Sequence, residues 1–498
     1  MGRNMALSVA SGVLLGLCFP DFSQGWLAWF ALVPLLVVAL RTPPGRATLY
    51  GFAAGVSFFG ILLFWLLSLE MWVGWGLAIL AWAALSIVQA TTLAVFAGAA
   101  SYVLRTSGSW GRQFAVPAVW MGLELFRSVG PWAFSWGVLG SSQTSVLPLL
   151  QPARLIGVFG VSYLIVLFNA VVLEFVRAEP EARRFTPSSI AGFALVAAAV
   201  LAGVLGGPAV EPQPVKVGVV QGNVAQEDKW LAGNLAEISS KYFGASEQMA
   251  DDGPELIVWP ETALPVRLNR NRELLARVHE LSQDTGASLL VGGSFEDGRR
   301  RQYNSVYFFT PDVGLRDRYD KIKLVLFGEY VPPWPLFGSM KTVAGLGDSL
   351  TAGRRISRFE TAGGTLAAAV CFESSDPFLN RMMVDNGARL LVVVTNDAWF
   401  GRTAAPAQHL DLLRVRAVEN GVFAVQAANT GFSALVGARG QVLSRSSLFT
   451  EETLVGDVRF ASRASFYSRI GYLLPVVGAV AGAAYLLLVF CSRTFARR

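Results

Sequence analysis

The chain has 498 residues, of which 53% are hydrophobic and only 15% are charged, and its mean hydropathy is +0.47. Soluble domains carry about 25% charged residues, so this composition argues against a purely cytosolic enzyme. The net charge of +6 comes from the apolar flanks, because residues 211–465 hold 29 acidic and 27 basic side chains. This balance argues against nucleic-acid binding, which needs a basic face on a folded domain.

The first 210 residues contain one apolar segment after another. About 20 apolar residues in a helix cross the roughly 30 Å hydrocarbon core of a bilayer. We expect a seven-helix membrane domain in residues 1–210 and one more transmembrane helix in residues 466–498, a polytopic α-helical bundle of about eight spans. The expected spans lie near residues 5–20, 25–40, 48–69, 74–104, 114–127, 155–176, 188–208 and 470–491.

The arginines indicate which side of the membrane each loop faces, because short cytoplasmic loops are enriched in Arg and Lys. With the N-terminus inside, the inner segments would be 41–46, 105–112, 177–184 and the basic tail from residue 493. Arg127 and Arg154 fall on the outer side, against this rule. The balance still favours a cytoplasmic tail and a non-cytoplasmic location for residues 211–465.

Residues 211–465 have a different pattern, in which short β-rich runs alternate with amphipathic stretches such as 271–286. Near-continuous apolar runs are typical of strands in a sheet that is buried on both faces. The sequence predicts strands at 215–223, 255–261, 288–295, 305–311, 365–373, 389–396, 421–429 and 432–437. About 250 residues in this alternation predict one α/β layered domain.

The residue inventory limits the possible chemistry. Two histidines and three cysteines almost exclude a zinc site, and we expect no metal and no other cofactor. No P-loop motif is present, so we expect no nucleotide partner. Cys371 ends a predicted strand in a domain that would face an oxidising compartment, where an idle thiol is a liability. A reactive and a buried structural cysteine both remain open at this position.

Charged residues lie at or near two other strand ends. Glu261 ends the predicted strand 255–261, and Lys321 and Lys323 lie together in the segment 319–331. In α/β folds, strand ends and the loops after them carry the chemistry. A lone acid after a strand is more often a solvated turn residue, so Glu261 by itself indicates no particular function.

The order and spacing of Glu261, Lys321 and Cys371 resemble those of the glutamate, lysine and cysteine of the nitrilase superfamily. Three flanking motifs narrow the resemblance, and they lie at 218–230, 327–332 (Phe-Gly-Glu-Tyr-Val-Pro) and 395–401 (Thr-Asn-Asp-Ala-Trp-Phe-Gly). When the expected spans are considered together with these motifs, the chain resembles the apolipoprotein N-acyltransferase family. This resemblance covers nearly the whole chain.

Three positions depart from the pattern of that family. Lys323 replaces an expected histidine, Leu326 an expected proline, and Phe372 a tyrosine that often follows the cysteine. The extra lysine leaves open which of the two acts, although the spacing of eight residues to Glu329 favours Lys321.

The resemblance implies a nitrilase-like αββα sandwich for residues 211–465, on the periplasmic side of the bacterial inner membrane. The implied reaction moves the sn-1 acyl chain of a phospholipid to the α-amine of the diacylglyceryl-cysteine of an apolipoprotein, in the last step of lipoprotein maturation. The phospholipid donor, the diacylated apolipoprotein acceptor and the lipid bilayer are then the expected partners. Conversion of an ester into an amide needs no energy input, which agrees with the missing nucleotide motif.

The same resemblance assigns roles to the three residues. Cys371 would form a thioester, which divides the transfer into two easier steps. Glu261 would move the protons, and Lys321 would stabilise the tetrahedral oxyanion. The residues expected to support these three are Glu329, Glu373 and Phe372.

The lipid-contact residues are harder to predict. The candidates are Trp230, Trp334, Trp399 and Asn396, and an ordinary core role remains open for each tryptophan. The segment 332–340 joins four large apolar side chains to three prolines and a glycine. We expect a mobile lid on the membrane-facing side, with a satellite core as the alternative.

Two other classes of protein remain open. A membrane-tethered amidase or nitrilase would share the Glu-Lys-Cys set, but it would hydrolyse a small amide and would not need the spans. A transporter or receptor would lack that set and would bury ionisable residues within its spans. Glu124 and Glu174 are the acidic residues seen within the expected spans.

Overall fold

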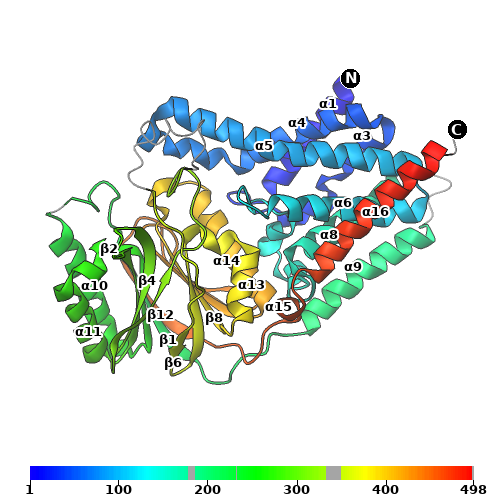
Figure 1. Ribbon diagram of the computed structural model, residues 1–498. Coiled ribbons are helices and arrows are strands. Elements are labelled where there is room, and N and C mark those ends of the chain that lie inside the picture. The colour runs from blue at the N-terminus through cyan, green and yellow to red at the C-terminus, as the bar shows by residue number, and fades with distance from the viewer. Residues whose placement is uncertain (178–184, 232, 332–348, 496–498) are drawn as a thin grey trace. The chain divides into compact units, whose positions relative to one another are not determined.

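The structure is a computed structural model that describes residues 1–177, 185–231, 233–331 and 349–495. The chain divides into two compact units. One unit joins Met1–Gly207 to Ser465–Arg498, and the other is Pro208–Ala464. The first unit is helical, and the second contains the β-strands (Figure 1).

The helical unit contains helices in every region where a span is expected. Its helices are α1 (Gly2–Leu17), α2 (Ala28–Ala31), α3 (Val33–Arg41), α4 (Pro44–Leu62), α5 (Glu70–Thr106), α6 (Ser109–Arg127), α7 (Leu147–Leu150), α8 (Ala153–Arg177), α9 (Pro187–Leu205), α15 (Phe466–Ile470) and α16 (Leu473–Phe495). Helix α5 has a non-helical residue at Gly74 and helix α8 at Gly157, both with positive φ, so both helices are kinked near their starts.

Four helical segments of the described chain are long and apolar enough to cross a membrane. They are Phe64–Thr106, Ala153–Arg177, Pro187–Leu205 and Leu473–Ser492, and Gly25–Arg41 forms a shorter apolar helix. The other expected spans coincide with helices that are shorter or less apolar. A membrane-spanning helical unit is therefore supported, whereas the count of about eight spans stays a prediction.

The second unit contains two six-stranded sheets, with strand orders β12-β1-β2-β3-β4-β5 and β11-β10-β9-β8-β7-β6. The first sheet consists of β1 (Val215–Gln221), β2 (Leu256–Arg267), β3 (Ser288–Glu296), β4 (Gln302–Thr310), β5 (Gly314–Asp320) and β12 (Glu452–Val458). The second consists of β6 (Phe359–Thr361), β7 (Gly364–Val370), β8 (Leu390–Thr395), β9 (Phe423–Ala428), β10 (Ala434–Val436) and β11 (Val442–Arg445).

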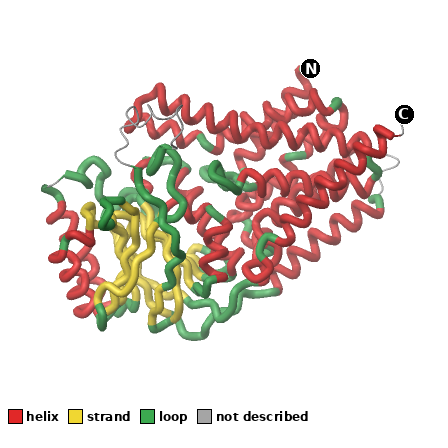
Figure 2. The backbone as a smooth tube through the Cα atoms, viewed as in Figure 1, coloured by secondary structure: helices red, strands yellow, loops and turns green. Residues whose placement is uncertain are grey.

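The two sheets share a core and are covered by helices on their outer faces. One buried cluster joins first-sheet residues such as Val258 and Phe308 to Ala368 and Val392 of the second sheet. Helices α10 (Leu235–Gln248) and α11 (Arg272–Thr285) cover the first sheet, and α13 (Pro377–Asp385) and α14 (Ala405–Asn420) cover the second (Figure 2). This is the αββα sandwich that the resemblance implied.

The predicted strands are present, but four others were missed. Strands β5, β6, β11 and β12 are short or rich in charged residues, and they lie at the edges of the two sheets. β5 reads Gly-Leu-Arg-Asp-Arg-Tyr-Asp, so only part of it is buried. An apolar run is the signal of a strand buried on both faces, and edge strands do not need one.

Strand β2 is longer than predicted, and Glu261 lies inside it rather than at its end. Its ladder with β3 is regular from Leu256 to Trp259, then shifts so that Leu264 pairs with Gly293. Thr262 has a left-handed φ of 50° within this irregularity. The strand bulges where the apolar run stops, and such a bulge re-aims the neighbouring side chain.

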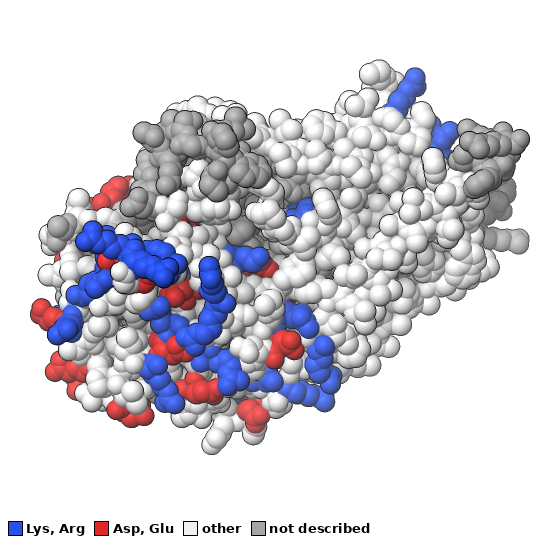
Figure 3. Space-filling model, in the orientation of Figure 1, with Lys and Arg blue, Asp and Glu red and all other residues white. Residues whose placement is uncertain are grey.

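Charge is distributed very unevenly between the two units. Figure 3 shows that, on the visible face, acidic and basic side chains gather over the α/β unit, whereas the helical unit is almost uncharged. Exposed residues of α9 and α16 include Leu201, Leu205, Leu487 and Phe490. Such surfaces are unusual for a soluble protein and agree with helices that face lipid.

Candidate active site

Cys371 directly follows β7 and begins the short 3₁₀ helix η7 (Cys371–Ser375). Its φ is 53°, in the left-handed region that residues other than glycine rarely adopt. The adjacent residue Val370 is fully buried, whereas Cys371 is partly buried. The sharp turn thus places a thiol at the end of a rigid central strand.

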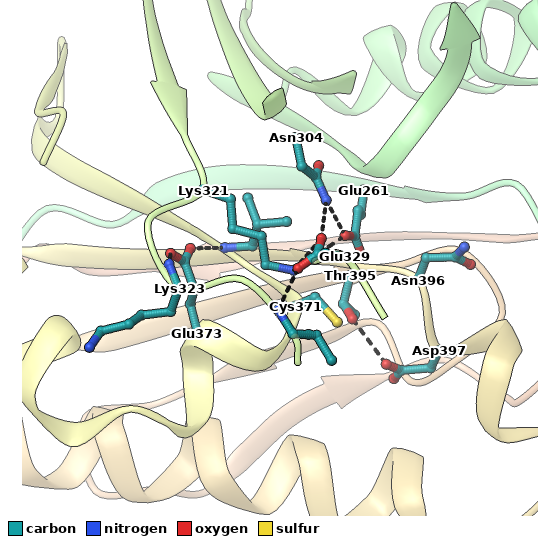
Figure 4. Close-up of polar contacts among 12 residues, drawn as sticks. Glu261, Asn304, Lys321, Lys323, Glu329, Cys371, Glu373, Thr395, Asn396 and Asp397 are labelled. Carbon is teal, nitrogen blue, oxygen red and sulfur yellow. Dashed lines mark hydrogen bonds and ion pairs between the residues drawn. The ribbon is translucent and has the colours of Figure 1, made fainter. Parts of the chain in front are cut away.

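Glu261 and Lys321 come from the first sheet and meet through a shared polar network (Figure 4). Lys321 Nζ lies 2.8 Å from Glu329 Oε2 and 3.8 Å from Glu261 Oε1. Asn304 Nδ2 on β4 donates to Glu261 Oε1 at 2.6 Å and to Glu329 Oε1 at 3.1 Å. Asn304 and Lys321 therefore bridge the two carboxylates.

Figure 4 shows the Cys371 thiol in the same group of side chains as Glu261 and Lys321, so the structure brings the three predicted residues together. Burial, reinforced by the Glu261 carboxylate, raises the pKa of the Cys371 thiol above its ordinary value, and Lys321 opposes this shift. The resting cysteine is therefore protonated. A protonated thiol needs a base to accept its proton before it can attack, and Glu261 is a carboxylate of the same group of side chains.

Lys321 is fully buried, and burial by itself would favour its neutral form. The carboxylates of Glu329 and Glu261 outweigh this effect and raise the pKa of Lys321 above its ordinary value. The residue is therefore a fixed ammonium beside the thiol. A fixed cation is what an oxyanion site requires.

The structure separates Lys321 from Lys323. The segment after β5 is bent rather than extended, so two residues that would share a face in a strand point in different directions. Lys323 is about half exposed, and its Nζ lies 3.5 Å from Asp376 Oδ2. Only Lys321 joins the network around Glu261.

Glu373 links the lysine loop to the nucleophile turn. Its Oε1 accepts hydrogen bonds from the Tyr319 hydroxyl and from the backbone N–H groups of Ile322 and Lys323, at 2.7–2.9 Å. Its Oε2 accepts from the Val370 N–H at 2.8 Å. Burial raises the pKa of Glu373 to about 7 in spite of these donors. This carboxyl group is fully occupied by its partners, so its geometry supports an orienting role.

Two family models match this chain. The carbon-nitrogen hydrolase model matches residues 216–467, and the model of the apolipoprotein N-acyltransferase N-terminal domain matches residues 11–171. The apolipoprotein N-acyltransferase of Geobacter metallireducens is 36% identical over 494 residues, which cover 97% of this chain and 94% of the relative. That of Gloeobacter violaceus is 34% identical over 490 residues, with coverage of 95% and 92%.

The chain belongs to the apolipoprotein N-acyltransferase family. The match extends over both units, because the relatives align with almost the whole chain and the N-terminal model falls in the helical unit. Membership of this family accounts for the combination of a nitrilase-like sandwich with apolar helices.

Several residues of this acyltransferase site were missed by the sequence analysis. Asn304 is a neutral residue within a strand and gave no signal. Lys229 belongs to the motif 218–230; it is buried and its Nζ donates to the Glu261 carbonyl oxygen at 3.0 Å. Burial lowers the pKa of Lys229 to about 8, although Glu261 opposes the shift. Its place in that motif was the one available clue.

A second missed group lies behind the nucleophile turn. His409 on α14 is buried between Asp397 and the backbone of Cys371. Thr395 donates its hydroxyl proton to Asp397 Oδ1 at 2.9 Å. Asp397 lies in the motif 395–401, and His409 is one of only two histidines in the chain, so both could have been singled out.

The candidate lipid-contact residues occupy different environments. Trp230 is 56% exposed and lines a cavity of about 830 Å³ with Arg267 and Arg270. Trp399 is 40% exposed in the 3₁₀ helix η8 (Asp397–Phe400). Trp334 and the whole segment 332–340 lie outside the described residues. Contact of these residues with lipid stays a prediction.

Asn396 is buried and connects three loops. Its Nδ2 donates to Gln226 Oε1 at 2.8 Å, and its Oδ1 accepts from Asn429 Nδ2 at 3.0 Å. Phe372 follows Cys371 and is partly buried. Within the described parts of the chain, no group of three or more His, Cys, Asp or Glu residues could hold a metal ion.

Proposed function

We propose that this chain moves an acyl group from the sn-1 position of a phospholipid, through a thioester on Cys371, to the α-amine of the diacylglyceryl-cysteine of an apolipoprotein. As a member of the apolipoprotein N-acyltransferase family, it acts in lipoprotein maturation. The observation that carries the catalytic proposal is the convergence of Glu261 and Lys321 on the thiol of Cys371.

The first half-reaction forms the acyl-enzyme. Glu261 takes the proton of the Cys371 thiol while the sulfur attacks the ester carbonyl carbon. The Lys321 ammonium stabilises the oxyanion that forms, and one such donor contributes roughly 3–4 kcal/mol. The carbon–oxygen bond then breaks, Glu261 returns the proton to the departing alkoxide, and the lysophospholipid leaves.

The second half-reaction transfers the acyl group to nitrogen. A free α-amine has a pKa of about 7.7–8.0, so part of it is neutral and nucleophilic at neutral pH. The amine attacks the thioester and gives a proton to Glu261, and the carbon–sulfur bond breaks. Glu261 then reprotonates the Cys371 sulfur, which restores the starting state.

Hydrolysis of a small amide by a membrane-tethered amidase is not favoured. An amidase would use the same three residues, but the named relatives that align with nearly the whole chain are acyltransferases. The family model that matches residues 11–171 is also specific to acyltransferases. A function that needs lipid substrates accounts for the apolar helical unit, and amide hydrolysis does not.

The membrane arrangement follows from the same proposal. Residues 1–210 would form the seven-helix domain, and 466–498 a last span with a cytoplasmic tail. The catalytic domain, residues 211–465, would then face the periplasm from the inner membrane. The four long apolar helices and the distribution of arginines support this arrangement.

Intact-mass measurement of the purified protein after exposure to phospholipid tests the proposal. We expect one acyl adduct on Cys371, no adduct in Cys371→Ser, and a normal adduct in the control variant Cys491→Ser. A peptide with a free amino-terminal diacylglyceryl-cysteine should discharge the adduct, whereas the N-acetylated peptide should not. An undiminished adduct in Cys371→Ser would rule out the thioester.

A further inference from the structure

His409 connects the outer helix α14 to the backbone of the nucleophile. It is 1% exposed, with Nδ1 at 3.0 Å from Asp397 Oδ1 and Nε2 at 3.1 Å from the carbonyl oxygen of Cys371. Neither contact involves a reacting atom. None of the mechanistic steps above uses this side chain, although it is buried and titratable.

The partners of the two ring nitrogens determine where the protons lie. The carbonyl oxygen of Cys371 can only accept, so Nε2 must carry a proton. Asp397 Oδ1 already accepts the hydroxyl proton of Thr395, and a carboxylate is an acceptor on both oxygens, so Nδ1 must carry a proton as well. Both nitrogens then donate, and the ring is an imidazolium paired with the Asp397 carboxylate.

The surrounding charges agree with this assignment. Burial alone would lower the pKa of His409, but Asp397, the Cys371 carbonyl and Glu261 together raise it above the ordinary value. These groups face the imidazole from η8, from η7 and from β2. The imidazolium and the carboxylate have opposite charges, so the buried pair is neutral as a whole. Buried ions in proteins are normally paired in this way.

The backbone of Cys371 needs such a support. A left-handed φ of 53° at a non-glycine residue costs free energy and persists only where the surroundings hold it. The hydrogen bond from His409 fixes the orientation of the peptide carbonyl at this turn. The orientation of that peptide group in turn sets the direction of the Cys371 side chain.

We propose that His409 is a positioning residue, whose Nε2–H holds the Cys371 carbonyl and thereby the turn that presents the thiol to Glu261 and Lys321. Asp397 sets the orientation of the imidazole. The inference rests on the proposed function in one respect, namely that Cys371 is the nucleophile. A neutral core histidine would leave one of the two buried acceptors without a proton, which is costly.

The first test reads the protonation state of His409 in the wild-type protein. Because the chain has two histidines, ¹⁵N-histidine labelling gives two sets of ring signals, and His279→Gln assigns them. We expect both ring nitrogens of His409 to carry a proton at neutral pH. An unprotonated Nε2 at neutral pH would overturn the proposal, whether or not the enzyme is active.

The second test compares two variants that leave no orphaned charge. Asp397→Asn keeps a histidine that can donate from Nε2, and Asp397→Asn/His409→Leu removes that donor. We expect the saturated rate of Cys371 acylation to be about tenfold lower in the double variant than in the single one, at unchanged half-saturating phospholipid concentration. Intact mass against time measures the rate, and thermal unfolding checks that both variants fold.

Equal acylation rates in the two folded variants would contradict the positioning role while leaving the thioester mechanism intact. A wild-type protein that forms no adduct would instead contradict the proposed function, and the ¹⁵N signals would still report on His409. If the double variant does not fold, the protonation state of Nε2 in the wild-type protein decides the question.

Discussion

The two sheets of the sandwich contribute different kinds of group to the site. The first sheet brings the charged groups, with Glu261 at a bulge in β2 and Lys321 just after β5. The second brings the proposed nucleophile, with Cys371 directly after β7. The groups that move or stabilise charge are thus built separately from the group that forms the covalent bond, and they meet only because the sheets pack face to face.

The groups from the first sheet, here called the charged side of the site, and those from the second sheet, the thiol side, are also held in place by different interactions. Lys321 is fixed by ion pairs with Glu329 and Glu261, and both of these carboxylates accept hydrogen bonds from Asn304. Cys371 is fixed by backbone geometry and carries no charge of its own at rest. The comparison teaches that charge substitutions should damage the first side, whereas changes in backbone support should damage the second.

Removal of the ammonium should have the largest effect on the charged side. We expect Lys321→Met to slow Cys371 acylation by about 10²–10³-fold, because the oxyanion loses its donor. Lys323→Met is the matched control and should stay within about twofold, since the Lys323 side chain is about half exposed. Single-turnover acylation measures both rates, and the reverse order of the two variants would move the catalytic role to Lys323.

A smaller effect should follow when the ammonium stays and its main counterion is neutralised. In Glu329→Gln we expect acylation to slow by about tenfold. The carboxylate of Glu329 helps raise the pKa of Lys321, so its loss lowers that pKa and the ammonium deprotonates at lower pH. The rate of the variant should therefore fall off at lower pH on the alkaline side than the rate of the wild type, and coinciding alkaline limbs would argue against the pairing.

A third effect concerns the pH dependence of stability and leaves the rate aside. The pKa of Glu373 is raised by burial to about 7, against roughly 4.3 in an unfolded chain. The folded state therefore binds this proton more tightly, and the wild type loses roughly 4 kcal/mol of stability from this group as pH rises from about 4 to above 7. The variant Glu373→Gln has no such titrating group. Its unfolding temperature should therefore lie closer to that of the wild type at about pH 8 than at about pH 5.

The exposed residue Glu360 provides the control for that measurement. Glu360→Gln should show no such change with pH, because its side chain is 51% exposed. Thermal unfolding of the three proteins at both pH values gives the comparison. A Glu373→Gln deficit that does not depend on pH would show that the carboxyl group is not protonated in the folded state at low pH.

Much of the fold followed from the apolar pattern, and the parts that did not follow lie where that pattern is absent or interrupted. Buried strands such as β8, which is apolar from Leu390 to Val394, could be located from their sequence. β5 and β12 lie at sheet edges. β12 pairs with β1, which is far away in the sequence, whereas β5 follows β4 directly in a hairpin and was missed because most of its residues are charged. The end of β2 was misplaced because a bulge interrupts the ladder without ending it.

The site was predictable where residue type and motif coincided. Glu261, Lys321 and Cys371 are chemically distinctive and stand near strand ends, and Glu329 lies within a motif. The choice between Lys321 and Lys323 could not be made from strand periodicity, because it depends on a bend in the loop. Asn304 and His409 act through hydrogen bonds that exist only once the sheets and helices have packed.

The carboxyl group of Glu373 has a consequence for how the site fluctuates. It joins the N–H groups of Ile322 and Lys323 on one side to that of Val370 on the other. A local opening of either segment would leave the buried carboxyl group without some of its hydrogen-bond donors, which costs free energy. The two segments should therefore exchange their amide hydrogens as one cooperative unit. The ammonium and the thiol are then either both in place or both displaced. A partly ordered site, in which water could hydrolyse the thioester, is rarely populated.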